Sequence, residues 1–362
     1  MSKIIISPAK YVQGENEILN IAKYVSQFGK KAILVASDDD YNRINDKIEK
    51  SLSNSDCKIL SVGFNGECSK KEIERIQEVL RDGDFQVVIG LGGGKSLDTA
   101  KAVAHFEKLP VIIVPTIAST DAPCSSLAVI YTEEGEFDEY CFFTQNPNVV
   151  LVDTDVIAKA PVRFLVAGMG DALSTYFEAR SCERSFAENI PGGMSTKAAI
   201  KMAELCYETL LEDSYKAKIA CENNVVTPAL ENIVEANILL SGLGFESSGL
   251  AAAHAIHNGL TVLEETHGMY HGEKVAFGVI THLILENADM EEIETVIDYC
   301  KILGLPTTLH ELGVEEVTYE KVQKVAEASC AEGETIHNMP FSVKVENVIA
   351  AILTANSLGK EK

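Results

Sequence analysis

The stretch VVIGLGGGKSLDTAKA, residues 87–102, places four glycines between positions 90 and 94, at the junction of an apolar run and an amphipathic segment. At a strand-to-helix junction, freed backbone N–H groups and the helix N-terminus favour a phosphate. The motif is not a Walker A loop, because Ile89 replaces its first glycine, and it is not GxGxxG, because Lys95 replaces the third. A tight turn that only needs small residues is the alternative. The stretch indicates an α/β fold with a candidate phosphate site.

The same alternation of apolar and amphipathic segments extends from Lys31 to about Asp153. The apolar runs, which we expect to be strands, are AILVAS (32–37), KILSVGF (58–64), FQVVIGL (85–91), PVIIVPT (110–116) and NVVLVDTDVI (148–157). They are too apolar to be half exposed, so a parallel sheet covered on both faces follows. Residues 125–143, with two β-rich runs around Glu134 and Gly135, predict a hairpin. This part of the chain is expected to be a doubly wound α/β domain.

The character of the sequence changes after Pro161. Long helical periodicities dominate from there on, as in KAAIKMAELCYETLLE at 197–212, and strand-like runs are almost absent. A chain of 362 residues also exceeds the usual size of a single core. We therefore expect an α/β domain over residues 1–160 and an all-helical domain over residues 161–362.

Composition and charge restrict the possible partners. The net charge of -23 would repel phosphate backbones and anionic lipids, so neither nucleic acid nor a membrane is an expected partner. The N-terminal apolar run has three residues, too few for a signal peptide, and no stretch of about 18 apolar residues follows. Nine scattered cysteines without a CxxC motif fit reduced thiols. We expect a cytoplasmic protein.

Hydroxyl and carboxylate side chains follow the strand that ends near position 115. Thr116, Ser119, Asp121 and Ser125 lie in a loop at the carboxyl edge of the predicted sheet, where open α/β sheets bind their ligands. The hydroxyls can donate hydrogen bonds to phosphate oxygens. A carboxylate is a poor phosphate neighbour, so Asp121 suits a hydroxyl-bearing substrate, or else it caps the loop.

The first predicted strand ends in VASDDD, which brings Ser37 and Asp38 to the same edge. An acid at this place can accept hydrogen bonds from a ribose diol and repels a 2′-phosphate. Aspartate is equally common as a helix N-cap. The sequence alone does not distinguish a ribose-binding acid from a helix N-cap.

Four of the eight histidines lie within residues 254–271. His254 and His257 are three residues apart and His267 and His271 four apart, so each pair shares a face if its segment is helical. A single histidine is more often part of the core, but this density favours a metal site. A catalytic zinc ion typically has three protein ligands and one open position. Asp171, in GMGDALSTYFEA, is the candidate carboxylate ligand or, alternatively, a helix cap.

Seven stretches together resemble the bacterial NAD-dependent glycerol dehydrogenases of the iron-containing alcohol dehydrogenase superfamily. They are ISPAKYVQG, GLGGGKSLDTAKA, PTIASTDAP, GMGDALSTYFEA, GLGFESSGLAAAHAIHNGLT, HGEKVAFG and AEGETIHN. The similarity extends over nearly the whole chain. It implies a dehydroquinate-synthase-like NAD-binding domain, a helical metal-binding domain and a homo-oligomer, an octamer in the resembled family.

The resemblance implies a zinc ion and its ligands. The ligands are Asp171, His254 and His271. His267 is then no ligand, and His257 lies behind the ligands or beside the substrate. The iron-binding relatives have a fourth ligand, a histidine, where this chain has Thr175, so a three-ligand zinc site is favoured over iron.

The resemblance also implies the nucleotide contacts. The pyrophosphate contacts are Gly94, Lys95, Thr116 and Ser119. The contacts on the nicotinamide side are Ser125, Leu127 and Tyr131. The resembled family has an acidic residue that binds the adenosine ribose. This chain has Ser37 at that position, and the neighbouring Asp38 can take over the role. Three consecutive aspartates at 38–40 favour NAD over NADP.

The implied reaction is oxidation of glycerol to dihydroxyacetone, with NAD accepting the hydride. The implied substrate contacts are Asp121, Asp171 and His254. Asp121 orients a hydroxyl, and His257 or a water chain removes the proton. Three alternatives remain: oxidation of another vicinal diol, a cyclase or lyase on the same fold, and a metal or nucleotide sensor without turnover. A cyclase with a phosphorylated substrate needs several basic residues near the metal, whereas these motifs contain only Lys274 in the helical half.

Overall fold

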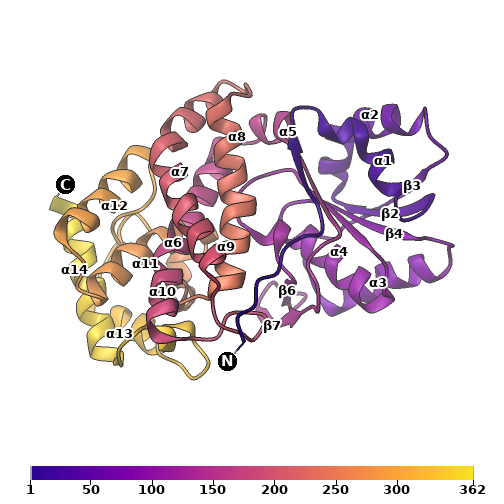
Figure 1. Ribbon diagram of the computed structural model, residues 1–362. Coiled ribbons are helices and arrows are strands. Elements are labelled where there is room, and N and C mark those ends of the chain that lie inside the picture. Colours follow the sequence, from indigo (N-terminus) through magenta and orange to yellow (C-terminus); the bar gives the residue numbers. More distant parts are fainter. Residues whose placement is uncertain (1, 362) are drawn as a thin grey trace. The chain divides into compact units, whose positions relative to one another are not determined.

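The structure, a computed structural model, describes residues 2–361, and the chain forms two compact units (Figure 1). One unit, the α/β unit, contains residues 7–162 and 220–239. The other, the helical unit, contains residues 2–6, 163–219 and 240–361. The chain therefore passes between the units four times, whereas the sequence suggested one boundary near residue 160. Within the described residues, no helix combines the length and hydropathy needed to cross a membrane.

A six-stranded parallel sheet forms the centre of the α/β unit, in the order β1-β8-β5-β4-β2-β3. The strands are β1 (Tyr11–Gly14), β2 (Lys31–Ala36), β3 (Lys58–Gly63), β4 (Val87–Gly92), β5 (Val111–Pro115) and β8 (Val149–Asp153). β4, β5 and β8 are buried throughout, as their apolar sequences require. The predicted doubly wound sheet is confirmed. β1 was not predicted, because its sequence YVQG contains no apolar run.

Helices cover both faces of this sheet. They are α1 (Ile21–Val25), α2 (Asp38–Leu52), α3 (Lys70–Arg81), α4 (Gly94–Glu107), α5 (Thr154–Ala158) and α8 (Pro228–Glu235). Figure 1 shows α1 and α2 on one face and α3 and α4 on the other. Glu231 of α8 accepts a hydrogen bond from Thr154 (3.0 Å), and its carbonyl accepts one from Gln13 (3.0 Å). These bonds attach α8 to the sheet, so the segment 220–239 belongs to this unit despite its place in the sequence.

The strand order reverses between β2 and β4, because β3 follows on one side of β2 and β4 on the other. This reversal point is where open α/β sheets bind ligands, outside the carboxyl ends of the strands. Gly92, the last residue of β4, has a φ of +138°. A Cβ at Gly92 would lie 3.2 Å from both Asp40 Oδ2 and Ser96 Cβ. Only glycine fits both the conformation and the space.

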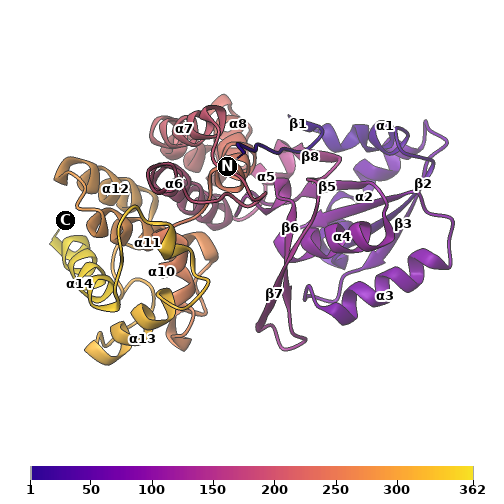
Figure 2. The same ribbon diagram turned by 60° about the horizontal axis from the view of Figure 1, so that its bottom comes forward.

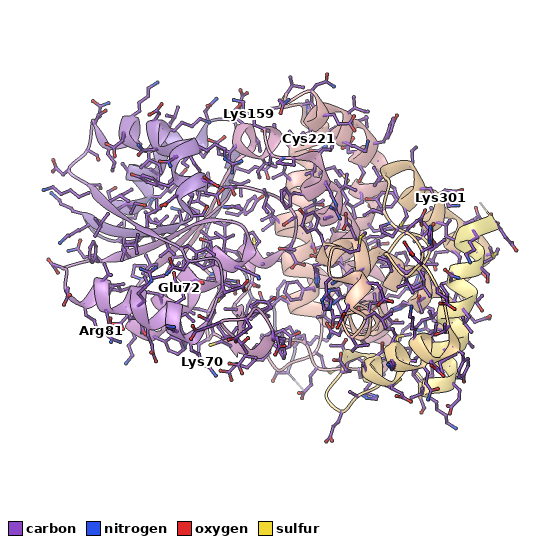
Figure 3. The ribbon with its side chains drawn as sticks, turned by 180° about the vertical axis from the view of Figure 1, so that it is seen from behind. Lys70, Glu72, Arg81, Lys159, Cys221 and Lys301 are labelled. Atoms are coloured by element: carbon purple, nitrogen blue, oxygen red, sulfur yellow. The ribbon has the colours of Figure 1, made fainter. Side chains whose placement is uncertain are left out.

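The predicted hairpin is also present, as the antiparallel strands β6 (Leu127–Tyr131) and β7 (Phe137–Phe142). Lys70, at the first position of α3, pairs with Asp138 and Glu139 of β7 at 3.0 and 2.9 Å. Figure 3 labels Lys70 and Arg81 at the two ends of α3. These ion pairs are exposed, so we expect them to contribute little to stability.

All regular elements of the helical unit are helices, as predicted (Figures 1 and 2). They are α6 (Val162–Ser185), α7 (Lys197–Glu222), α9 (Ser241–Ser248), α10 (Ala252–Leu260), α11 (His271–Leu285), α12 (Met290–Leu303), α13 (Tyr319–Ser329) and α14 (Val345–Glu361). A π-helical turn, Ala236–Leu240, leads from α8 into α9. Residues 2–6 belong here because the backbone N–H of Ile4 donates to Met194 (3.2 Å) and that of Ile6 to Ser247 Oγ (3.3 Å).

Candidate functional site

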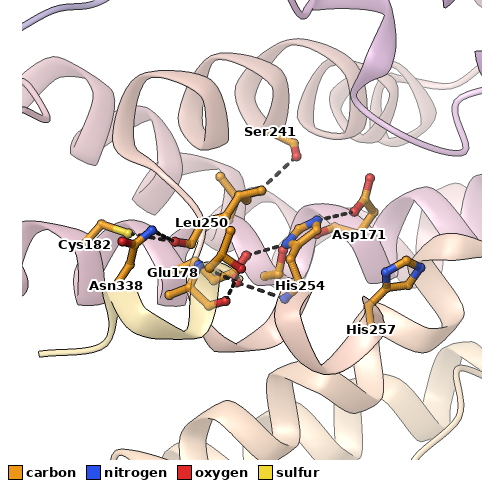
Figure 4. Close-up of polar contacts among 12 residues, drawn as sticks. Asp171, Glu178, Cys182, Ser241, Leu250, His254, His257 and Asn338 are labelled. Carbon is orange, nitrogen blue, oxygen red and sulfur yellow. Dashed lines mark hydrogen bonds and ion pairs between the residues drawn. The ribbon is translucent and has the colours of Figure 1, made fainter. Parts of the chain in front are cut away.

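Three helices of the helical unit bring Asp171, His254 and His271 together. Asp171 lies on α6, His254 in the first turn of α10, and His271 is the first residue of α11. Oδ1 of Asp171 is 3.1 Å from Nε2 of His271 and 3.6 Å from Nε2 of His254. One potential ligand atom from each residue lies within 4.8 Å of the other two. Figure 4 shows Asp171 and His254 facing each other. The residues predicted from the sequence therefore form one cluster.

Glycines allow these helices to approach closely enough for the cluster to form. A Cβ on Gly272, beside His271, would overlap the carbonyl oxygen of Ala167 on α6. A Cβ on Gly278 of α11 would overlap the carbonyl oxygen of Ala253 on α10. Both contacts are with backbone atoms, which cannot rotate away. The separations within the cluster thus depend on the missing side chains of these glycines.

Glu178, a residue that was not identified from the sequence, supports His254. It lies seven residues after Asp171 on the same helix and is fully buried. Its Oε2 is 2.6 Å from Nδ1 of His254, and its Oε1 accepts hydrogen bonds from the backbone N–H groups of Ala251 (2.8 Å) and His254 (3.0 Å). Glu178 therefore caps α10 and fixes the imidazole so that Nε2 points to Asp171. A carboxylate behind a histidine is the usual support for a metal ligand.

The charges in the cluster shift its pKa values. Burial would raise the pKa of Asp171, but His271 and His254 lower it well below its ordinary value. Burial would likewise raise the pKa of Glu178, and His254 lowers it. Burial lowers the pKa of His254, but Glu178 and Asp171 outweigh this and raise it well above its ordinary value. Both carboxylates are therefore ionised at neutral pH and supply negative charge to the cluster.

Arg163, on the first turn of α6, holds the segment that leads into His271. Its guanidinium pairs with both carboxylate oxygens of Glu273, at 2.6 and 2.8 Å, and lies 4.5 Å from the centre of the Tyr270 ring. Glu273 in turn accepts a hydrogen bond from the backbone N–H of Tyr270 at 2.7 Å. The side chain of His271 is 37% exposed, against 3% for Asp171. His271 is the most exposed of the three cluster residues, and Arg163 thus holds the backbone on either side of it through Tyr270 and Glu273.

His257 lies beside the cluster. Its ring centre is 4.1 Å from that of His271, and its Nδ1 is 3.0 Å from Oδ1 of Asn258. Asn258 donates from Nδ2 to Glu334 at 3.0 Å, which leaves its Oδ1 to accept from His257. The proton of the neutral ring is therefore assigned to Nδ1, and Nε2 keeps its lone pair. Burial lowers the pKa of His257 well below the ordinary value, and His271 and Lys274 lower it further.

Two further residues of this region, His267 and Thr175, were not expected to be ligands. His267 is exposed, and its Nε2 lies 3.0 Å from the carbonyl oxygen of Thr261, outside the cluster. Thr175 is buried, and its hydroxyl is 2.9 Å from that of Ser241 on α9. The Thr175 hydroxyl is thus engaged in holding α6 and α9 together.

The ligand set of Asp171, His254 and His271 fits a divalent cation. Oδ1 of Asp171 is buried and makes no hydrogen bond, although two imidazole nitrogens lie within 3.6 Å of it. An unsatisfied buried acceptor costs about 1–3 kcal/mol, and more when charged. A cation shared by one carboxylate and two imidazoles removes that cost. Mixed nitrogen and oxygen ligands suit zinc.

The glycine-rich turn of the α/β unit is the second candidate region. Gly94 is the first residue of α4, and the space where its Cβ would lie is open. Thr116, at the end of β5, donates its backbone N–H to the carbonyl of Gly92 at 3.0 Å. Ser119 follows in the same loop and is half-buried. The predicted pyrophosphate residues Gly94 and Thr116 therefore follow two neighbouring strands at their carboxyl ends.

Lys95 has a partner that the sequence did not suggest. Its Nζ lies 2.6 Å from both carboxylate oxygens of Glu67 and 4.9 Å from the centre of the Tyr131 ring. Lys95, which was assigned to the pyrophosphate, and Tyr131, which was assigned to the nicotinamide side, are in contact. Any phosphate that binds this ammonium group competes with Glu67.

The loop before the hairpin is held by a buried lysine, Lys101, which sequence analysis also missed. Its Nζ pairs with Asp98 at 2.8 Å and donates to Ser125 Oγ (3.1 Å) and to the carbonyls of Ala122 (2.9 Å) and Leu127 (2.5 Å). The hydroxyl of Ser125 is thus engaged within the loop, and Leu127 contributes its backbone. These two predicted nicotinamide contacts have a structural role in the fold.

Ser37 and Asp38 lie at the carboxyl end of β2, where α2 begins. Ser37 is the N-cap of α2: its Oγ accepts the backbone N–H of Asp40 at 3.1 Å. The carboxylate of Asp40 accepts hydrogen bonds from Ser37 Oγ (2.9 Å) and from Arg43 Nη2 (2.8 Å). Asp38 is exposed, and its carboxylate lies beside Gly63 at the end of β3. The N-cap is therefore the serine, and Asp38 is exposed next to the carboxyl end of β3.

Asp121 lies in the loop after β5. It precedes a short 3-10 helix, Ala122–Cys124, and its side chain does not cap that helix. The carboxylate is half-buried.

Comparison with known proteins reveals extensive similarity. The model of the family "Iron-containing alcohol dehydrogenase" matches residues 8–154. The glycerol dehydrogenase of Citrobacter freundii is 55% identical to this chain, over 100% of the chain and 99% of the relative. The glycolaldehyde reductase of Halobacterium salinarum is 48% identical, over 99% of each. The crystal structure of glycerol dehydrogenase from Schizosaccharomyces pombe is 42% identical and has a TM-score of 0.96, covering 99% of this chain and 92% of that one.

The fold and these similarities define an oxidoreductase of the alcohol dehydrogenase type. The chain belongs to the iron-containing alcohol dehydrogenase family, within the branch of the glycerol dehydrogenases. The resemblance of the sequence motifs to that family is thereby confirmed.

Proposed function

We propose that this chain oxidises glycerol at its secondary carbon to dihydroxyacetone, with zinc as the metal and NAD as the hydride acceptor. The observation that carries the proposal is the cluster of Asp171, His254 and His271, whose ligand atoms are already within 4.8 Å of one another. It occurs in a chain that is 55% identical to a glycerol dehydrogenase. A resident cation and a small polyol account for both facts.

The metal would be held by Asp171, His254 and His271. Three protein ligands leave a position open for substrate oxygens, which is typical of catalytic zinc. Thr175, bonded to Ser241, does not supply a fourth ligand. When bound, zinc supplies Lewis-acid polarisation of a substrate oxygen.

Two side chains of the protein would handle the substrate hydroxyls. Asp121 accepts a hydrogen bond from one hydroxyl and orients the substrate. His257 accepts the proton of the reacting hydroxyl at Nε2, directly or through water. The hydrogen bonds from His257 to Asn258 and on to Glu334 support this role, because they keep the proton on Nδ1.

The nucleotide would bind at the reversal point of the sheet, with its pyrophosphate at the N-terminus of α4 near Gly94, Thr116 and Ser119. Backbone N–H groups and the helix dipole supply most of the binding there. The exposed carboxylate of Asp38 binds the adenosine ribose and repels a 2′-phosphate, which favours NAD. Lys95 contributes to phosphate binding only in competition with Glu67.

A second candidate substrate comes from the 48% identical glycolaldehyde reductase. Glycolaldehyde, like glycerol, carries two oxygens on adjacent carbons, so both can chelate one metal ion. The same residues would then run the reaction in the direction of reduction.

Steady-state kinetics on the zinc-loaded protein tests the proposal. NAD reduction is measured with glycerol, 1,2-propanediol, 2,3-butanediol and ethanol, and NADH oxidation with dihydroxyacetone and glycolaldehyde. We expect vicinal diols to exceed ethanol by at least about tenfold in kcat/KM, with glycerol among the best substrates. A higher kcat/KM for glycolaldehyde than for dihydroxyacetone would favour the second candidate. NAD reduction that is equal with and without a chelator would overturn the metal-dependent reaction.

A further inference from the structure

The loop that follows β5 carries two residues with a role in the proposed function, Ser119 and Asp121. Hydrogen bonds fix this loop near both of its ends. Its first residue, Thr116, donates its backbone N–H to the carbonyl at the end of β4 (3.0 Å). Further on, the carbonyl of Ala122 accepts a hydrogen bond from a buried lysine of α4 (2.9 Å). The position of both functional side chains therefore depends on what holds the stretch between these points, residues 117–121.

A buried amide from a distant part of the chain holds this middle stretch. Nδ2 of Asn237 donates a hydrogen bond to the carbonyl of Ala118 at 3.0 Å, across 119 residues of sequence. Both residues are 1% exposed, and both belong to the α/β unit. Ala118 directly precedes Ser119 and lies three residues before Asp121, so this bond fixes the backbone that carries the two side chains.

The surroundings of Asn237 indicate that the amide is needed for its hydrogen bond rather than for packing. Its neighbours in the sequence, Ala236 and Ile238, are apolar and fully buried. A buried amide costs free energy unless it is hydrogen-bonded, whereas an apolar side chain at this position would pack without that cost. The amide thus supplies a donor that an apolar residue could not offer to the loop.

The backbone around Asn237 is also unusual. Residues Ala236–Leu240 form the π-helical turn between α8 and α9. Such turns are rare and occur frequently at functional sites. The hydrogen bonds that Glu231 accepts from Gln13 and Thr154 fix α8 on the sheet. Asn237 follows about two helical turns later, so its position toward the loop is set by an anchored helix.

We propose that Asn237 is a positioning residue for the reaction, because it holds the loop in the place from which the carboxylate of Asp121 orients the substrate. This inference rests on the proposed function, in which Asp121 accepts a hydrogen bond from a substrate hydroxyl. Without the amide, the buried carbonyl of Ala118 loses this donor and the loop relaxes. Binding of the pyrophosphate is less sensitive, since backbone groups at the N-terminus of α4 supply most of it.

Steady-state kinetics of Asn237→Ala, with glycerol and with 2-propanol, tests this role. We expect kcat/KM for glycerol to fall about fivefold, which is less than for loss of the Asp121 carboxylate itself. For 2-propanol, which has no second hydroxyl for Asp121 to orient, the fall should be less than about twofold. The Kd of NADH, measured by fluorescence titration, should also change less than about twofold.

A matched control separates positioning from a loss of stability. Asn356 on α14 is likewise buried, at 5% exposure, and its Oδ1 accepts the backbone N–H of Leu309 at 2.9 Å in the helical unit. Asn356→Ala should lower the thermal midpoint about as much as Asn237→Ala, because both lose a buried hydrogen bond. The ratio of kcat/KM between glycerol and 2-propanol should stay at the wild-type value in this control.

A double-mutant cycle tests whether Asn237 acts through Asp121. In the Asp121→Asn background, the further change Asn237→Ala should lower kcat/KM for glycerol by less than about 1.5-fold, against about fivefold in the wild-type background. Asn237→Ser is the milder second variant, because its hydroxyl ends one bond short of the amide nitrogen. It should give the same pattern, and it replaces Asn237→Ala throughout if that variant does not fold.

The outcomes distinguish this inference from the proposed function. Equal losses for the two alcohols, or effects that multiply in the cycle, overturn the role of Asn237 and leave the proposed function intact. Wild-type protein that does not reduce NAD with glycerol overturns the proposed function, and the role of Asn237 with it.

Discussion

The two candidate regions use their residues in opposite ways. In the helical unit, Asp171, His254 and His271 present side-chain atoms, and Glu178 and Arg163 support them from behind. In the α/β unit, several predicted side chains are already engaged: Ser37 caps α2, Lys101 binds Ser125, and Lys95 pairs with Glu67. A metal site requires specific donor atoms, whereas a phosphate site at a helix N-terminus uses backbone N–H groups that any sequence supplies. Substitutions should therefore be severe in the first region and mild in the second.

The largest effect should follow removal of a ligand. His254→Ala or His271→Ala is expected to lose zinc and to reduce kcat/KM with glycerol by at least roughly a thousandfold, because the Lewis acid is lost. His267→Ala, the control from the same segment, should keep both. Metal content by mass spectrometry, together with circular dichroism to verify folding, checks this. Full zinc in the His271→Ala protein would contradict the assignment.

Disrupting the close backbone contact at Gly272 should have an effect almost as large as removing a ligand. Gly272→Ala inserts a methyl group against the carbonyl of Ala167 and is expected to destabilise the protein by about 1–3 kcal/mol. Because His271 precedes this glycine, zinc affinity should fall as well. Gly268→Ala, in the loop before α11, meets no atom within 4 Å and serves as the control. Urea unfolding and competition with a zinc chelator measure the two effects, and equal behaviour of both variants would disprove the close-contact argument.

Asp121 is the one side chain of the α/β unit for which we expect a large catalytic effect. Asp121→Asn keeps the shape but loses a charge-assisted hydrogen bond worth about 1.5–3 kcal/mol. Turnover of glycerol should fall by roughly ten- to a hundredfold, whereas 2-propanol, which has no second hydroxyl, should lose less. NADH titration by fluorescence should show nearly unchanged affinity. Collapse of NADH binding, with equal losses for both alcohols, would make Asp121 a cofactor or structural residue.

A smaller effect is expected on the preference for NAD over NADP. If the carboxylate of Asp38 repels a 2′-phosphate, kcat/KM with NAD should exceed that with NADP by at least about tenfold, or about 1.4 kcal/mol. Asp38→Asn should narrow this ratio, while Asp39→Asn, on the next residue, should change it less. Equal use of the two cofactors by the wild-type protein would refute the argument.

The smallest effect should come from Ser125. Its hydroxyl is bonded to Lys101 and to the carbonyl of Ala122, so Ser125→Ala is expected to lower stability by about 1 kcal/mol. NADH affinity should change less than about twofold, because the hydroxyl is not available to the nucleotide. Thermal unfolding and fluorescence titration separate these outcomes. A tenfold loss of NADH affinity at unchanged stability would instead support Ser125 as a contact of the nicotinamide.

What could be predicted from the sequence depended on how far apart the interacting residues lie. The strands β2, β4 and β5 are apolar runs that can be recognised locally. The density of four histidines within residues 254–271 indicated a metal site, and the family resemblance implied which of them are ligands. Glu178 could not be identified, because His254 lies 76 residues away, and Lys101 could not, because its partners in the loop lie more than 20 residues away. A buried lysine and an exposed one look the same in a sequence. The close contact at Gly272 was equally invisible, since it depends on how two helices pack.

The four passages of the chain between the units have a consequence for the order in which the protein can fold during synthesis, which proceeds from the N-terminus. The sheet and its flanking helices α1–α5 are made first, but α8, which binds Gln13 and Thr154, follows some 70 residues after α5. A ribosome must therefore translate the two long helices α6 and α7 before the α/β unit can be completed. Residues 2–6 are likewise synthesised long before their partners, because Ile6 can bind Ser247 only after another 241 residues have been made.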